Sequence, residues 1–537
     1  MSKVKKWGGH MLSVNNLSLV FPNRKLFEDV NIKFTSGNCY GIIGANGAGK
    51  STFVKILSGE LDSTKGDVTI SPNERLAVLN QNHYEFDEFT VLDTVLMGHQ
   101  RLYDIMKEKE VLYSKADFND ADGIKAGDLE SEFADLNGWE AEYNVKKMLN
   151  ELGIGEDLAE KKMMELNGKD KVKVLLAQVL FGNPDILIMD EPTNHLDFKT
   201  IAWLEEFLIN YEKTVIVVSH DRHFLNKVCT HMVDIDYGTA KLFPGNYDFW
   251  YESSELLLRM AKDGNKKKEQ RIKELEAFIA RFSANASKSK QATSRKRSLE
   301  KIELDDLKPS SRKYPFIGFN INRELGKDIL TVDSLTKTID GVNILKNVSF
   351  TLNKGDKAVI IAKDDMVATT LLKILSGELN ADSGSFKWGQ TVEMGYLPND
   401  NHAYFDGCEL NLIEWLAQYS KDKNESFIRS FLGRMLFSGD EPLKHVRVLS
   451  GGEKVRCMFS KLMLAGSNTL LLDQPTNHLD LESIQAVNKG LMTYPGSMIF
   501  TSHDHSFIDS IANKIIEIKE DGIFYVDSTF DEYLNRP

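Results

Sequence analysis

The sequence has 537 residues, 42% hydrophobic and 27% charged, with a net charge of -13, as expected for a folded protein of several domains that is not a general nucleic-acid binder. It has no apolar run near the ~18 residues that a membrane helix needs, and residues 1–10 lack the apolar core of a signal peptide. Its four cysteines show neither metal-binding spacing nor a disulfide framework. We therefore expect a cytoplasmic protein with no membrane span, iron–sulfur cluster or zinc finger.

The first chemical motif is a glycine-rich loop between a predicted strand (39–43) and a predicted helix (52–57), with the spacing G-x-x-x-x-G-K-S. Backbone N–H groups of such a loop surround phosphate oxygens, and the helix N-terminus adds the positive end of its dipole. Lys50 is expected to reach the β and γ phosphates of ATP, and Ser51 to bind Mg²⁺. The candidate ATP contacts of this loop are Gly44, Ala45, Asn46, Gly47, Ala48, Gly49, Lys50, Ser51 and Thr52.

An internal repeat indicates that the chain contains two copies of one domain. Three peptides occur twice: 55–61 recurs at 373–379, 192–197 at 475–480, and 219–221 at 502–504. The offset is 373 - 55 = 318 residues for the first peptide and 475 - 192 = 283 for the second, so the first copy has 318 - 283 = 35 additional residues. They lie between Gln81 and Leu166, and we predict a helical arm over about 98–145.

Two further apolar strands of the first copy end in residues suited to phosphate chemistry. The strand predicted to end at residue 189 is followed by Asp190 and Glu191, which places one carboxylate for the metal and the next for a water molecule. The strand over 214–218 precedes Ser219 and His220, whose imidazole can face a γ-phosphate. In the second copy, a glycine-rich turn opens a helix and forms a second anion cradle with Ser450, Gly451 and Gly452.

A basic segment separates the two copies. Residues 262–301 include 13 Lys/Arg and 5 Asp/Glu, a net charge of +8 on an otherwise acidic chain. Two antiparallel helices around a basic turn are predicted by apolar residues at helical spacing: Ile272, Leu275, Ile279, Phe282, Leu299 and Ile302. The charge indicates one anionic partner, with a solvated spacer as the alternative. If the partner is RNA, we expect phosphate contacts from Lys288, Lys290, Arg295, Lys296 and Arg297.

These motifs resemble the ATP-binding cassette (ABC) superfamily over nearly the whole chain. Two cassettes, a short insertion in the first and a basic helical linker are similar to the ABC-F family of translational ATPases, and the runs at 281–288 and 291–295 are similar to its YbiT subgroup. The resemblance implies binding to the ribosome, with the arm at the exit-site region and the linker directed toward peptidyl-tRNA, so that rRNA and tRNA are the expected partners. It also implies two ATP molecules, each held between one P-loop and the signature of the other cassette.

The fold expected from this resemblance is α/β, with two tandem P-loop NTPase cassettes joined by an α-helical hairpin linker. Each cassette should have a mixed sheet core and a helical subdomain. We place cassette 1 at 1–253, the basic linker at 254–325 and cassette 2 at 326–537. The protein is expected to be a monomer whose two cassettes pair within one chain.

The second copy departs from the family pattern in its P-loop, where Gly44, Gly49, Lys50 and Ser51 align with Ala362, Val367, Ala368 and Thr369. Asp364 and Asp365 stand in its cradle, where two carboxylates would repel a polyanion. Three other matched positions also differ: Phe21, expected to stack on adenine, aligns with Ile339, Gln81 with Asn399, and Glu191 with Gln474. An amide cannot accept a proton at neutral pH, so Gln474 cannot replace a glutamate base.

All these losses, with the altered first signature at 166–171, fall on one composite site. The other set is complete: Phe21, the first P-loop, Gln81, Asp190, Glu191, His220, Ser450, Gly451 and Gly452. We therefore predict an Mg-ATP-dependent ATPase with one competent site, in which Ser51, Gln81 and Asp190 hold the metal and Glu191 and His220 are catalytic. It would bind the ribosome in its ATP-closed state and modulate translation.

Two other functions stay open at this stage. A fused ATPase subunit of a membrane transporter also has two cassettes, although the basic linker argues against it. A scaffold that binds ATP without turnover is the other alternative, against which Glu191 and His220 argue. Nothing in the linker marks a role in antibiotic resistance.

Overall fold

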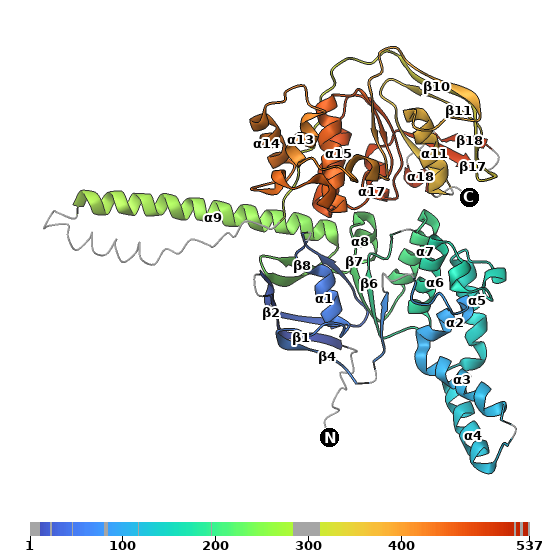
Figure 1. The fold of residues 1–537 in the computed structure, drawn as a ribbon. Coiled ribbons are helices and arrows are strands. Elements are labelled where there is room, and N and C mark those ends of the chain that lie inside the picture. Colours follow the sequence, from blue (N-terminus) through green and yellow to red (C-terminus); the bar gives the residue numbers. More distant parts are fainter. Residues whose placement is uncertain are drawn as a thin grey trace.

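The computed structural model describes residues 11–21, 24–45, 47–72, 74–79, 84–115, 117–194, 196–282, 312–362, 364–519, 522–526 and 530–534. In these residues the strands form four sheets, two in each half of the chain (Figure 1). The two halves stack on one another, and two helical projections leave the first half in different directions (Figure 1).

A six-stranded sheet forms the core of the first half. Its strands are β3 (Cys39–Ile43), β5 (Leu76–Leu79), β6 (Ile186–Asp190), β7 (Thr214–Val218), β8 (His231–Asp236) and β9 (Thr239–Pro244). They lie in the order β5-β6-β7-β3-β8-β9, parallel except for β9, which pairs with β8 in the antiparallel sense. Both faces are covered, because Leu187 and Met189 belong to one apolar cluster and Ile186 and Ile188 to another.

A three-stranded antiparallel sheet covers one face of this core. It consists of β1 (Met11–Phe21), β2 (Arg24–Thr35) and β4 (Lys65–Ile70), in the order β2-β1-β4. The helix α1 (Lys50–Leu57) contributes Phe53 to the apolar cluster that this sheet shares with the core strands. The start of α1 is therefore fixed at the carboxyl end of β3.

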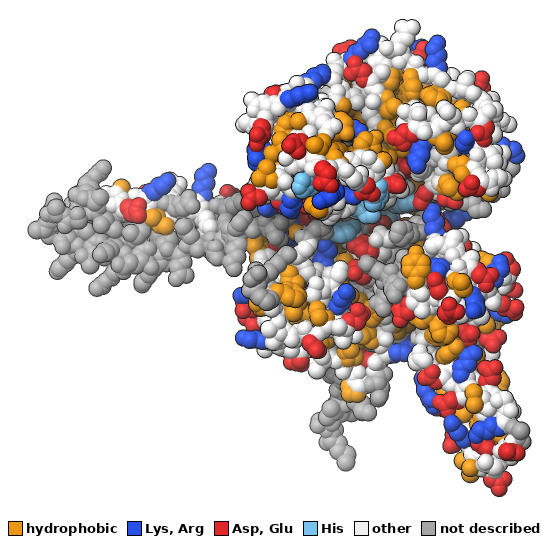
Figure 2. Space-filling model, in the orientation of Figure 1, with side chains coloured by type: hydrophobic (Ala, Val, Ile, Leu, Met, Phe, Trp, Pro, Cys, Tyr) orange, Lys and Arg blue, Asp and Glu red, His pale blue; other side chains and the backbone are white. Residues whose placement is uncertain are grey.

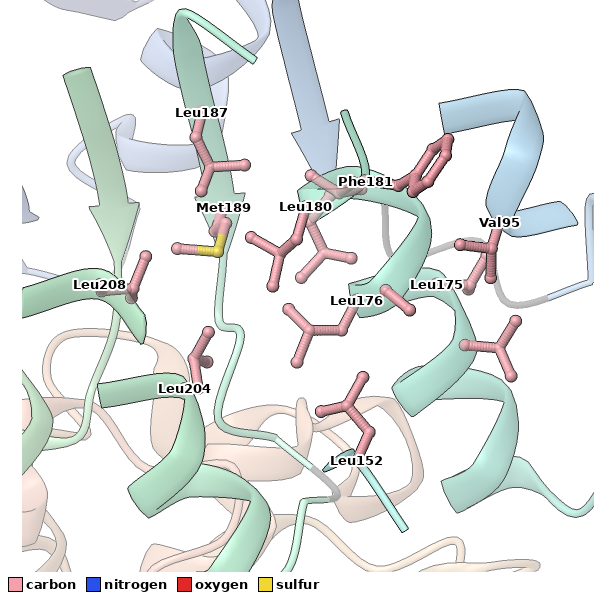
Figure 3. Close-up of a cluster of buried hydrophobic side chains, with 14 of the residues drawn as sticks. Val95, Leu152, Leu175, Leu176, Leu180, Phe181, Leu187, Met189, Leu204 and Leu208 are labelled. Atoms are coloured by element: carbon pink, nitrogen blue, oxygen red, sulfur yellow. The ribbon is translucent and has the colours of Figure 1, made fainter. Parts of the chain in front are cut away.

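Helices cover the other face. They are α2 (Val91–Leu96), α5 (Ala141–Glu151), α6 (Gly168–Leu180), α7 (Phe198–Ile209) and α8 (Arg222–Val228). Figure 3 shows how β6 meets two of them: Leu187 and Met189 point into a cluster that contains Leu176 of α6 and Leu204 of α7. All four side chains are buried, so this contact anchors α6 and α7 to the strand that ends at Asp190.

The segment expected as a helical arm contains α3 (Gln100–Tyr113) and α4 (Asp120–Asp135), which project from the body (Figure 1). The two helices are joined by ion pairs between Arg101 and Glu132 and between Lys109 Nζ and Glu130 Oε2, 2.9 Å apart. Phe133 lies beneath the Lys109 ammonium at 3.8 Å from the ring centre, so that cation–π and charge contacts both hold α3 against α4.

The second half repeats the architecture of the first. Its core strands are β12 (Lys357–Ala362), β14 (Met394–Leu397), β15 (Thr469–Leu472), β16 (Ser497–Phe500), β17 (Lys514–Lys519) and β18 (Gly522–Val526), in the order β14-β15-β16-β12-β17-β18. This order matches the first sheet position by position. A second antiparallel sheet has β10 (Asp328–Ile339), β11 (Val342–Asn353) and β13 (Ser383–Trp388) in the order β11-β10-β13. The predicted fold class of two tandem α/β cassettes is therefore confirmed.

The helices of the second half follow the same plan without the arm. They are α11 (Asp365–Ser376), α12 (His402–Phe405), α13 (Leu412–Ala417), α14 (Glu425–Arg434), α15 (Gly451–Ala465), α16 (Leu481–Met492), α17 (His505–Ile511) and α18 (Phe530–Leu534). Leu481 of α16 packs in the apolar cluster of the first half, so the two halves share part of a core.

The segment between the halves begins with α9 (Tyr247–Phe282), one helix of 36 residues that leaves the body (Figure 1). The expected boundary after residue 253 falls inside this helix. The predicted basic turn and second helix, with Lys288, Lys290, Arg295, Lys296 and Arg297, lie outside the described residues. Ile317, Phe319 and Ile321 pack on the second core, so this stretch of the expected linker joins the second half. Within the described ranges, no helix is long and apolar enough to span a membrane.

Candidate active site

The first P-loop runs from the end of β3 to the start of α1. Gly47 and Gly49 have φ angles of 74° and 105°, in the left-handed region that favours glycine. A Cβ on Gly44 would lie 2.5 Å from the carbonyl oxygen of Ile235, so the backbone approaches too closely for a side chain. The Nζ of Lys50 donates to the carbonyl oxygen of Gly44 at 2.8 Å, which turns the ammonium into the loop. The loop therefore has the shape and charge of an anion cradle.

Burial is the main influence on Lys50, whose side chain is nearly enclosed. It lowers the pKa of the ammonium, while the charges of Glu191, Glu482, Asp480 and Asp190 oppose the shift. The ammonium can bind phosphate oxygens, and the carboxylates can bind a divalent cation. The site therefore suits a polyanionic ligand that carries a divalent cation.

Asp190 closes β6 opposite the start of α1. Burial raises the pKa of its carboxyl group, and a hydrogen bond with Ser51 and the charge of Lys50 oppose that rise. The Ser51 hydroxyl and the Asp190 carboxylate thus lie together, as hard oxygen donors for Mg²⁺ should. These two residues fit the predicted metal site, whereas Gln81, the third predicted ligand, lies outside the described residues.

Glu191 and His220, which the sequence predicts to be catalytic, lie in contact. The backbone N–H of His220 donates to Glu191 Oε2 at 3.1 Å, and His220 Nε2 lies 3.4 Å from Glu191 Oε1. Burial raises the pKa of Glu191 to about 8, and burial with the charge of Lys50 lowers the pKa of His220 to about 4. His220 is therefore a neutral imidazole at pH 7. Its buried Nδ1 has no hydrogen-bond partner among the described residues, as expected for a nitrogen reserved for a ligand.

The second half also reaches this site. Asp480 acts on the pKa of both Lys50 and His220, and Glu482 acts on that of Lys50. Asp480 is the N-cap of α16, where its carboxylate accepts the N–H of Ser483 at 2.8 Å. The charges around the first P-loop thus come from both halves, which makes the site composite.

The second signature adjoins the segment that carries Asp480. Ser450 caps α15, with its N–H 2.7 Å from Glu453 Oε2. A Cβ on Gly452 would lie 2.7 Å from the carbonyl oxygen of His478, and one on Gly451 would meet the His478 side chain at 3.3 Å. Both glycines therefore allow α15 to start directly against residues 478–480.

The remaining predicted residues occupy the expected elements. Phe21 ends β1 with its side chain 46% exposed, as a stacking platform for a base requires. Ala45 and Ala48 lie in the loop and Thr52 lies in α1, whereas Asn46 is outside the described residues. Sequence reasoning missed Asp480 and Glu482. The duplicated peptide that ends at Asp480 is a sequence signal for Asp480. Glu482 aligns with Lys199, so the repeat contains no signal for it.

The corresponding region of the second half is built differently. The helix α11 begins at Asp365, which aligns with Gly47, whereas α1 begins three residues later in the alignment, at Lys50. Ala368 is buried at the position of Lys50. Asp473, the counterpart of Asp190, accepts hydrogen bonds from the hydroxyls of Thr369 and Thr501, each at 2.8 Å. A helical turn thus replaces the phosphate loop. The carboxylate that corresponds to Asp190 already has two threonine hydroxyls as hydrogen-bond partners.

Comparison with known proteins identifies the family. A family model described as "ABC transporter" matches residues 27–194 and 345–477, and another with the same description matches 233–319. The uncharacterized ABC transporter ATP-binding protein YkpA of Bacillus subtilis is 63% identical over 98% of each chain, and the probable ATP-binding protein YbiT of Escherichia coli O157:H7 is 45% identical over 98% of this chain and 99% of its own. ABC transporter F family member 2 of Arabidopsis thaliana is 31% identical over 97% of this chain and 78% of its own. The chain belongs to the ABC-F family.

This ABC-F protein is an ATPase, and the family implies ATP binding at its cassettes. The predicted likeness to the YbiT subgroup is confirmed by the match to YbiT. The energy-dependent translational throttle protein EttA of Escherichia coli K12 is 30% identical over 96% of this chain and 93% of its own. An archaeal ribosome recycling factor, aABCE1, solved in complex with a ribosomal stalk protein, has a TM-score of 0.63 over 97% of this chain and 92% of its own. At 17% identity, it supports the fold alone.

Proposed function

We propose that this ABC-F protein is a cytoplasmic, Mg-ATP-dependent ATPase that binds the ribosome in its ATP-closed state and modulates translation through one competent composite site. The observation that carries the proposal is that Asp480 of the second half lies close enough to act on the pKa of Lys50 and of His220. Both residues belong to the first-half group that also contains Asp190 and Glu191. Because the segment that ends at Asp480 reaches Lys50 and adjoins the signature glycines, whose backbone N–H groups can bind an anion, a nucleotide held by both halves would favour the closed arrangement over the open one.

In this site each residue has a distinct task. The P-loop backbone and Lys50 hold the phosphates, Phe21 stacks on the base, and Ser51, Gln81 and Asp190 hold Mg²⁺. Mg²⁺ held by these residues would neutralise charge on the phosphates during hydrolysis. Glu191 polarises the attacking water, and its contact with the His220 N–H fixes the direction of its carboxylate. His220 donates to the γ-phosphate, and Ser450, Gly451 and Gly452 complete the cradle from the second half.

Glu191 is well placed for this task because of its backbone. Its φ angle of 54° lies in the left-handed region, which a residue with a side chain adopts only where the surrounding structure requires it. Gln474 has the same conformation, at φ 50°, so the two halves hold this side chain alike and differ in its chemistry. At a pKa of about 8 the Glu191 carboxyl group is mostly protonated at pH 7 without nucleotide, and only its ionised form can accept a proton from water, which the amide of Gln474 cannot do in any form.

The ribosome enters the proposal through the relatives. EttA is named as an energy-dependent translational throttle protein. The candidate contacts are the arm of α3 and α4 for the exit-site region, and the basic segment at 262–301, which begins within α9, for rRNA and tRNA. Hydrolysis would then remove the contacts that favour the closed shape and release the protein.

Cosedimentation tests this proposal against a transporter subunit. The Glu191→Gln protein, which should hold ATP without hydrolysing it, would be spun with purified ribosomes or with membrane vesicles, with and without ATP. We expect pelleting with ribosomes that needs ATP, and no pelleting by a Lys50→Ala control under any condition. Pelleting with vesicles alone, or with ribosomes regardless of ATP, would contradict the proposal.

A further inference from the structure

A cluster around one carboxylate of α11 joins the two halves. Lys169 Nζ of the first half lies 3.0 Å from Asp365 Oδ2, and His503 Nε2 of the second half lies 3.0 Å from Asp365 Oδ1. Each oxygen of one carboxylate thus contacts a different nitrogen. Figure 2 shows histidine side chains gathered along this seam between the halves.

The three residues occupy meaningful positions in the duplication. Asp365 aligns with Gly47 of the first P-loop (365 - 318 = 47), and His503 aligns with His220 (503 - 283 = 220). Lys169 aligns with Gly452 of the second signature (169 + 283 = 452). At the competent site these positions are a phosphate loop, a γ-phosphate imidazole and a signature from the opposite half. The Asp365 carboxylate therefore lies among the groups that surround a terminal phosphate at the other site.

The surroundings favour a negative charge at this point. The contacts with His503 and Lys169 outweigh burial and hold the pKa of Asp365 well below its usual range. Phe198, from the first half, lies beside the cluster, with its ring centre 6.0 Å from that of His503 and 5.2 Å from that of Phe530. One ion pair at a partly exposed site contributes little, but here the Lys169 ion pair and the His503 contact share one carboxylate beside packed rings.

We propose that the Asp365 carboxylate takes the place of a nucleotide γ-phosphate in the second composite site and keeps that side of the interface closed without ATP. The inference rests on the proposed function in one respect, namely that only the first site binds ATP. ATP would then open and close the first site alone, with the Lys169–Asp365–His503 cluster as a fixed hinge. In the second composite site, the Asp365 carboxylate would thus replace the phosphate of a bound nucleotide.

Distances between spin labels on the isolated protein test this directly. One label pair, at Met164 and Glu378, spans the second site, and the pair at the aligned positions Arg447 (164 + 283 = 447) and Glu60 (378 - 318 = 60) spans the first; all four residues are exposed. In the Glu191→Gln background we expect the second-site distance to be single and unchanged by ATP, and the first-site distance to shorten with ATP. Asp365→Asn should broaden the nucleotide-free second-site distance toward longer values.

The matched control is Asp364→Asn, which removes the same charge one residue away. Asp364 caps α11 by accepting the N–H of Met366 at 3.0 Å, and asparagine caps equally well, so this variant should behave as the parent. Unchanged distances in Asp365→Asn, or a second site that opens without nucleotide in the parent, would overturn the proposal.

Equilibrium binding of labelled ATP separates this failure from failure of the proposed function. Near one ATP per chain with two mobile sites would refute the hinge and leave the single-site ATPase intact. Two ATP per chain would refute both the single-site assignment and the hinge. Neither measurement uses ribosomes. A protein that fails to bind ribosomes would therefore contradict only the proposed function.

Discussion

Arg312 Nε lies 3.0 Å from Glu482 Oε1, and this contact joins the segment between the halves to the second half. The same guanidinium pairs with Asp234 and with Asp236, both on β8 of the first half, and lies over the ring of Trp250 at 4.8 Å. Glu482 in turn acts on the pKa of Lys50. One buried arginine therefore links β8, the base of α9 and the edge of the ATP site.

Replacing Arg312 by glutamine should destabilise the protein strongly. Three carboxylates would lose the cation that compensates their burial, and breaking a buried charge network in this way costs about 3–5 kcal/mol. Urea unfolding would measure the loss. Arg259→Gln is the control, because Arg259 is exposed and pairs only with Glu255 on the same helix in the described contacts. A loss no greater than that of the control would contradict this account.

Glu191→Gln should retain ATP binding and lose most turnover, about 100-fold or more, because the amide cannot act as a base. Gln474→Glu should change turnover little, since Ala368 and the helical turn at Asp365 remain in the second half. Steady-state ATPase assays of both variants are sufficient. A large gain from the Gln474 change would show that the second half contains a working site.

The five linker cations should act through phosphate charge. Changing Lys288, Lys290, Arg295, Lys296 and Arg297 to glutamine should weaken ribosome binding of the ATP-trapped protein and reduce its salt dependence, by a slope of about 0.7–0.9 for each phosphate that is no longer neutralised. Intrinsic ATPase should stay near that of the parent. The control removes five exposed lysines elsewhere, with the same change in net charge: Lys33, Lys346, Lys387, Lys421 and Lys423. Equal effects in the two variants would reduce the linker to a spacer.

A partly buried pair of aspartates between the halves should make the free energy of unfolding depend on pH. Asp221 and Asp504 cap α8 and α17, and burial raises their pKa values to about 7 and about 6. The folded state then binds the protons more tightly than the unfolded chain, so this stabilisation is present at low pH and is lost as pH rises through 6 to 7. Stacked rings of His223 and His505, 3.9 Å apart, mark the same contact.

Asp504→Asn keeps the cap and removes the titration. Its melting temperature relative to the parent should therefore rise between pH 5 and pH 8, as measured by calorimetry at several pH values. Asp382→Asn is the control, because Lys337 lowers the pKa of the exposed Asp382, so its titration lies below this range and its melting temperature relative to the parent should not change between pH 5 and pH 8. A difference for Asp504→Asn that does not change with pH would exclude this pair as the origin of any pH dependence.

The sequence predicts the parts of the site that short-range chemistry determines. Gly47, Gly49 and Lys50 are constrained by the loop itself, and Asp190 and His220 follow directly from buried strands, so spacing alone locates them. Asp480, Glu482 and the pairing of Asp365 with Lys169 depend on how two distant halves pack, which no local pattern records. The start of α9 was also missed. The boundary expected after residue 253 places the aromatic residues at 247–251 in the cassette. In the structure they begin α9, the helix that the later apolar spacing predicts.

The length and attachment of α9 determine how far a small movement at the nucleotide site displaces the far end of this helix. At 1.5 Å per residue, its 36 residues make a rod of about 54 Å. Its first residue is tied to the second half by Gln485, which donates to the Tyr247 hydroxyl at 2.7 Å, while Trp250 packs in the core of the first half. A rotation of the helix base by ~10° would move the far end by about 9 Å, on the geometry of a stiff rod of this length. The helix is thus a lever whose short arm lies between the cassettes and whose long arm includes the first part of the basic segment, residues 262–282.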